Sequence, residues 1–212
     1  DLQAALAQAT GEFLAQLRRR LPKATFLVQF DEPLIDRVLE GSVPTPSGFS
    51  AYKPVEQPNA SAALRLCVKS AQASGALPGA HTCATSAPIA LLREAGFLFV
   101  SIDLTLVSQL ARRDRDEFDE QFGALLDSER LLFAGLGVDP AARPAPERTV
   151  RPLTDALGRL AIDPGKVLDQ LVLTPTCGLA GVGKMANVRA VIAELSAAGR
   201  LLRDERVDLQ EG

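Results

Sequence analysis

Short apolar runs typical of buried strands alternate along this chain with stretches of helical periodicity. Strands are predicted at residues 26–30, 77–82, 97–102, 131–138 and 171–173. Helices are predicted at residues 1–20, 59–74, 86–95, 114–128, 149–161 and 184–203. This alternation predicts an α/β fold in which helices cover a parallel sheet.

The composition limits the class of protein further. The chain has 212 residues, of which 47% are hydrophobic and 23% charged, and this balance excludes a disordered chain. A net charge of -3 gives no basic surface for nucleic acid, and no apolar run is long enough to span a membrane. Three cysteines and no signal-peptide pattern at the first residues favour a reducing, cytoplasmic location. We expect a single domain over residues 1–212.

Side chains that bind metals follow the predicted strands. His81 and Cys83 come at the end of the second strand, Asp103 ends the third, and Cys177 follows the last. In a parallel α/β barrel the carboxyl ends of the strands converge on one face, which carries the functional site. We therefore expect these four residues to lie close together.

This set of donors favours zinc. One imidazole nitrogen, two thiolate sulfurs and one carboxylate oxygen complete a tetrahedral zinc site. Soft thiolate ligands disfavour magnesium and calcium. His81, Cys83, Asp103 and Cys177 are therefore the predicted ligands of Zn²⁺.

Each of these residues also has a simpler interpretation. His81 is compatible with an ordinary core or surface position, and Asp103 with the N-cap of a following helix. Asp31 and Glu32, after the first strand, are candidates for a helix cap as well. Cys67 lies inside a predicted helix, and we interpret it as a small buried hydrophobic residue.

Two other kinds of chemistry are open from the residues alone. A Cys–His pair, with Cys177 or Cys83 as the nucleophile, would attack an acyl group, but this leaves the second cysteine and Asp103 without a role. The glycine-rich segment 178–184 ends in lysine like a phosphate-binding loop. Met185 then stands where that motif has a hydroxyl residue, so we interpret the segment as a strand-to-helix turn.

Three of these motifs together resemble the catalytic barrel of the cobalamin-independent methionine synthase family. They are His-Thr-Cys at 81–83, followed by Asp103; Thr-Pro-Thr-Cys-Gly-Leu at 174–179; and Asp-Glu-Pro at 31–33. The resemblance covers roughly residues 26–200 and extends to the wider group of zinc-dependent methyltransferases that share the fold of uroporphyrinogen decarboxylase. Asp103 stands where that family usually has glutamate, and Thr-Pro-Thr replaces its usual Asn-Pro-Asp.

The resemblance implies a TIM (β/α)₈-type barrel. A complete barrel takes about 250 residues, and five strands match its later part. We therefore expect the later five βα units, as the C-terminal part of a longer methionine-synthase-like barrel protein. A partial barrel exposes strand edges, so self-association is a further expectation.

The resemblance also implies the activity. His81, Cys83, Asp103 and Cys177 would hold zinc, and Asp31 would bind the amino group of homocysteine. Zinc would then activate a thiolate that accepts a methyl group from a folate or a corrinoid protein. The alternatives are a non-catalytic or truncated barrel relative that binds zinc or a partner without turnover, and a hydrolase or decarboxylase on the same fold.

Overall fold

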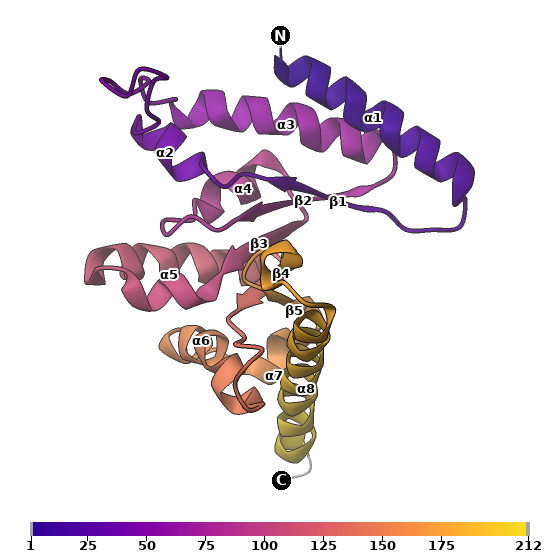
Figure 1. Ribbon diagram of the computed structural model, residues 1–212, viewed down its shortest axis with the longest axis vertical. Helices are drawn as coiled ribbons and strands as arrows, with labels where there is room; N and C mark the ends of the chain where they lie inside the picture. The colour runs from indigo at the N-terminus through magenta and orange to yellow at the C-terminus, as the bar shows by residue number, and fades with distance from the viewer. Residues whose placement is uncertain (1, 211–212) are drawn as a thin grey trace. The chain divides into compact units, whose positions relative to one another are not determined.

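Residues 2–210 are described by the computed structural model, which divides the chain into two compact units. Unit 1 comprises Asp1–Val100 and unit 2 comprises Ser101–Gly212. Each unit alternates strands and helices (Figure 1). The strand order is β1-β2-β3-β4-β5, which follows the order along the chain.

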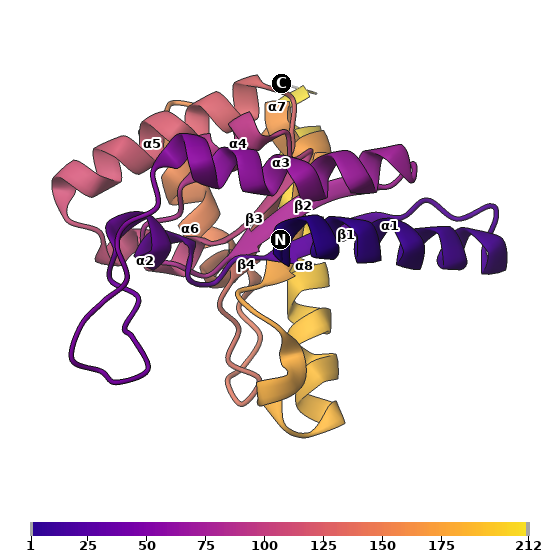
Figure 2. The same ribbon diagram turned by 90° about the horizontal axis from the view of Figure 1, so that it is seen from above.

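Unit 1 is built on two parallel strands. Its elements are α1 (Leu2–Arg20), β1 (Leu27–Asp31), α2 (Ile35–Glu40), α3 (Gln57–Ala73), β2 (Leu77–Thr82) and α4 (Ile89–Ala95). β1 and β2 pair in parallel, and Asp31 stands opposite His81. α1 and α3 lie side by side (Figures 1 and 2). Leu14 and Ala71 from these helices pack with Ala76 against Phe26, Val28 and Phe30, which anchors both helices over the two strands.

Unit 2 begins inside β3 and contains the remaining strands. Its elements are β3 (Phe99–Asp103), η1 (Leu104–Gln109), α5 (Arg112–Asp127), β4 (Leu131–Leu136), α6 (Pro146–Arg159), α7 (Pro164–Val167), η2 (Leu168–Gln170), β5 (Leu171–Pro175), η3 (Leu179–Val182) and α8 (Met185–Gln210). β4 and β5 pair in parallel. Phe122 on α5, Leu132 on β4 and Leu153 on α6 are fully buried, so both helices rest on an apolar strand.

The predicted α/β class is confirmed. All five predicted strands are present, and the β1–β2 and β4–β5 pairs are parallel. The short elements α2, η1, α7, η2 and η3 were not predicted, because each is too short to show a hydrophobic period. The cap predicted from Asp31 and Glu32 is wrong, since α2 has Leu34 at its N-cap with no side-chain hydrogen bond. Across residues 2–210, no helix combines the length and apolar character that crossing a membrane requires.

Candidate metal centre

β2 and the turn after it position His81 and Cys83. His81 lies near the end of the strand and is half-buried. The next residue, Thr82, is fully buried, and its Oγ1 accepts a hydrogen bond of 3.1 Å from the backbone N–H of Ala84. Such a side-chain turn bends the backbone directly after a strand. It presents half-buried Cys83 from the same short segment as His81.

Cys177 lies after β5, where a glycine in the neighbouring strand allows close approach. Gly135 of β4 pairs with Thr174, and a Cβ atom placed on it would lie 3.1 Å from the Cα of Thr176. Thr176 is therefore held close against β4. Cys177 follows it, is exposed, and precedes the single 3₁₀ turn of η3. Segment 178–184 thus forms the predicted connection from β5 to α8.

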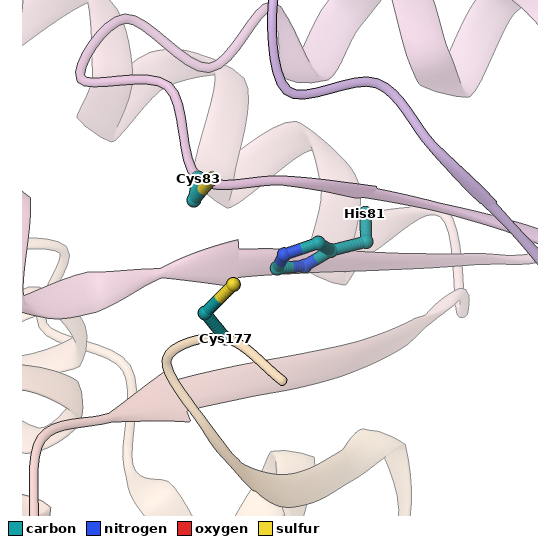
Figure 3. Close-up of side chains that lie close together, drawn as sticks. All are labelled: His81, Cys83 and Cys177. Carbon is teal, nitrogen blue, oxygen red and sulfur yellow. The ribbon is translucent and has the colours of Figure 1, made fainter. Parts of the chain in front are cut away.

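The ligand atoms of His81, Cys83 and Cys177 all lie within 4.8 Å of one another. Figure 3 shows these three side chains, with His81 on β2, Cys83 directly after it and Cys177 on the segment that follows β5. Donor atoms around a tetrahedral zinc ion are about 3.6 to 3.8 Å apart, given Zn–S and Zn–N bonds of about 2.3 and 2.1 Å. The limit of 4.8 Å exceeds this spacing by only about 1 Å. The chemistry and spacing of this set fit a zinc ion.

Asp103 does not belong to this group of three. It ends β3, and its Oδ1 accepts hydrogen bonds from the backbone N–H of Thr105 at 2.9 Å and from the Thr105 hydroxyl at 2.6 Å. The carboxylate is the N-cap of η1. The capping interpretation of Asp103 is therefore confirmed, and its role as a fourth ligand stays a prediction.

Asp31 lies at the same strand end as His81. The two residues are partners in the parallel register of β1 and β2, so their side chains project from the same face of the strand pair. The backbone N–H of Glu32 donates to the carbonyl oxygen of His81 at 2.8 Å and fixes this end of the pair. Gln29 donates from Nε2 to Oδ1 of Asp31 at 2.8 Å. The exposed Asp31 carboxylate is thus held beside His81.

Glu32 and Cys67 form a separate, more buried pair of groups. Burial and then the charge of Asp31 raise the pKa of Glu32. Burial and then the charge of Glu32 raise the pKa of the Cys67 thiol, which keeps this thiol protonated at neutral pH. Cys67 lies in α3 and is 6% exposed, so its interpretation as a structural residue is confirmed.

Two features of the site were missed by the sequence analysis. The buried hydroxyl of Thr82 sets the turn that carries Cys83 after β2, and Gly135 admits the backbone next to Cys177. A glycine inside an apolar strand is a recognised signal of close backbone approach, so Gly135 was open to prediction.

Comparison with known proteins adds no family to these observations. No protein-family model matches the chain, and no curated protein matches its sequence. The function of this chain is therefore inferred from its residues and their arrangement.

Proposed function

We propose that this protein is a zinc-dependent methyltransferase that transfers a methyl group to the sulfur of homocysteine or a similar amino thiol. The observation that carries the proposal is the group formed by His81, Cys83 and Cys177. The order of strands and helices supports the further proposal that the chain comprises the later five βα units of a (β/α)₈ barrel.

The number and type of ligands favour a catalytic rather than a structural zinc site. Structural zinc sites are closed by four protein ligands, whereas catalytic sites have three and leave one position for water or substrate. His81, Cys83 and Cys177 are three such ligands. The Asp103 carboxylate caps η1 through Thr105, so the proposed catalytic set uses three of the four ligands predicted from the sequence. These three residues would hold a zinc ion and would leave room on it for the thiol substrate.

The charge of the ligand set suits an activated thiolate. Two cysteine thiolates balance the charge of Zn²⁺, and His81 binds as a neutral imidazole. A free thiol has a pKa of about 8.5 and is mostly protonated at neutral pH. A bound zinc ion would supply the Lewis acidity that keeps the substrate thiol deprotonated. The anionic ligands Cys83 and Cys177 keep that sulfur electron-rich and nucleophilic.

Asp31 is the group that recognises an amino thiol. Its carboxylate lies at the same strand end as His81, and its Oδ1 already accepts a hydrogen bond from Gln29. The carboxylate retains acceptor capacity for a substrate ammonium group in a charge-assisted hydrogen bond. Asp31 thereby orients the substrate with its thiol toward the metal ligands. The sulfur then forms a bond to the methyl carbon as the bond from that carbon to a folate or corrinoid donor breaks.

The test is direct detection of thiol methylation. Zinc-loaded protein is mixed with homocysteine and either 5-methyltetrahydrofolate or methylcobalamin, and methionine is quantified by mass spectrometry. We expect methionine with one of the two donors, and loss of the product in Cys177→Ser but not in Cys67→Ala. If folded, zinc-loaded protein methylates neither homocysteine nor other thiols with either donor, the proposal is refuted. The chain would then be a zinc-binding relative without turnover.

Asp31→Asn tests the substrate's amino group. This variant is expected to raise KM for homocysteine while leaving the reaction of 3-mercaptopropionate, which has no amino group, unchanged. Equal effects on both thiols would show that Asp31 does not bind the ammonium group.

A further inference from the structure

A groove rich in arginine lies between two helices of unit 2. It has a volume of about 430 Å³ and is bordered by α5 and α6, which are labelled in Figure 1. Its cationic lining consists of Arg115, Arg148, Arg151 and Arg159. Leu104 and Val107 of η1 and Pro152 of α6 add apolar surface. This volume lies within the usual range of small-molecule sites, about 300 to 1,000 Å³.

Two of the four arginines already have carboxylate partners. Arg159 donates from Nε and from Nη2 to the two carboxylate oxygens of Asp119, each at 2.7 Å. Arg151 lies 3.6 Å from Asp155 in an exposed ion pair one helical turn apart. Arg151 and Arg159 therefore line the groove but add little net positive charge to it.

The other two arginines retain unused donors. Arg148 is exposed, and within residues 2–210 its guanidinium group makes no hydrogen bond or ion pair. Arg115 is held in place by bonds from Nη2 to the carbonyl oxygens of Leu110 at 2.9 Å and Ser108 at 3.4 Å. Its Nε is buried and has no hydrogen-bond partner among the described residues. A buried charged donor without a partner is unfavourable, so this Nε retains capacity for an acceptor that enters the groove.

We propose that this groove binds a small organic phosphate monoester, with its phosphate on Arg115 and Arg148 and its apolar part against η1. A guanidinium group presents a planar fork of donors that matches the oxygens of a phosphate. Two uncompensated guanidinium groups balance the two charges of a phosphate monoester. The apolar residues Leu104, Val107 and Pro152 favour an organic phosphate over the inorganic ion.

This proposal is independent of the zinc site. Every residue that lines the groove belongs to unit 2 and none is a proposed metal ligand. The groove should therefore bind its ligand equally well in the wild-type protein and in Cys177→Ser, so failure of one proposal does not affect the other.

Titration calorimetry at low ionic strength tests the proposal with phenyl phosphate as the probe. Inorganic phosphate, phenylacetate and benzyl alcohol separate the contributions of the dianion, of a carboxylate and of the apolar ring. Phenyl phosphate is expected to bind most tightly. Tighter binding of phenylacetate, or absence of phenyl phosphate binding at millimolar concentration, would overturn the proposal.

Variants identify the arginines that bind the phosphate. Arg148→Gln and Arg115→Gln are each expected to weaken phenyl phosphate binding roughly tenfold to a hundredfold, as expected for loss of a charge-assisted hydrogen bond. Arg113→Gln is the matched control, because Arg113 is an exposed cation of α5 that does not line the groove. Unchanged binding in Arg148→Gln, or an equal loss in Arg113→Gln, would refute the site. The Arg148 side chain makes no hydrogen bond or ion pair among the described residues, so its variant remains informative if Arg115→Gln fails to fold.

Discussion

Replacing Gly135 with alanine tests how tightly the strand ends of unit 2 are packed beside Cys177. The new Cβ atom would lie 2.6 Å from the backbone carbonyl oxygen of Ile102 and 3.2 Å from the Cα of Asp103. Real Cβ atoms essentially never come closer than 3.0 Å to another heavy atom. The obstructing atoms are backbone, so a side-chain rotation cannot relieve the contact, and a strand must move.

The expected cost follows from this overlap. Overpacking a buried position usually destabilises a protein by about 1 to 3 kcal/mol, and a fixed backbone obstacle favours the upper part of that range. A loss of about 2 kcal/mol lowers the melting temperature of a protein of this size by about 4 to 8 °C. Thermal unfolding followed by far-ultraviolet circular dichroism measures the shift.

Gly158→Ala provides the matched control. Gly158 lies in α6, and a Cβ atom there meets no atom within 4 Å. The same substitution is therefore expected to leave stability unchanged or raise it by up to about 1 kcal/mol, because alanine is the better helix former. An identical melting temperature for Gly135→Ala and the wild type would refute the close packing of the strands around Gly135.

Three further substitutions test separate interactions. Burial and the charge of Asp31 raise the pKa of Glu32 above its usual 4.5, so the folded protein loses stability as the pH rises from 4.5 through the folded-state pKa. Glu32→Gln should therefore be more stable than the wild type by a larger margin at pH 7 than at pH 4 in urea unfolding. An equal difference in unfolding free energy at the two pH values would contradict this. Thr149→Val removes the buried hydroxyl that donates to Oε1 of Glu194 at 2.9 Å and should lower the free energy of unfolding by about 1.5 to 3 kcal/mol. The control Thr154→Val should change it by less than about 0.5 kcal/mol. Equal effects of the two substitutions would argue against a specific hydrogen bond to Glu194. Leu153→Ala, at a fully buried position of α6, should lower the free energy of unfolding by about 2 to 5 kcal/mol because it creates a cavity. The control is Leu66→Ala, whose side chain is 42% exposed. A loss for Leu153→Ala as small as that for Leu66→Ala would show that α6 does not pack on the core.

The order of strands was predictable because apolar β-prone runs such as 97–102 are short and bounded by clear breaks. The candidate ligands could be selected for the same reason, since His81 lies near the end of a strand and Cys177 follows one, and both strand ends are marked in the sequence. Parallel strands carry their carboxyl ends to one edge, so strand order alone predicted that these side chains gather.

Other features depend on contacts between residues far apart in sequence. The capping of η1 by Asp103 requires the turn to Thr105, and a carboxylate after a strand is equally suited to a cap and to a metal. The arginine groove joins Arg115 of α5 to Arg148 of α6, and no spacing rule relates these two positions. The division at Val100 falls inside a strand, where the composition shows no break.

Zinc content per chain is the most direct test of the central claim. Freshly purified protein, never exposed to chelator, is measured by plasma mass spectrometry beside Cys177→Ser, His81→Ala and the control Cys67→Ala. The account predicts one zinc ion per chain in the wild type and in Cys67→Ala, and loss of zinc in the other two variants. Folded wild-type protein without zinc, or Cys177→Ser with a full complement, would contradict it.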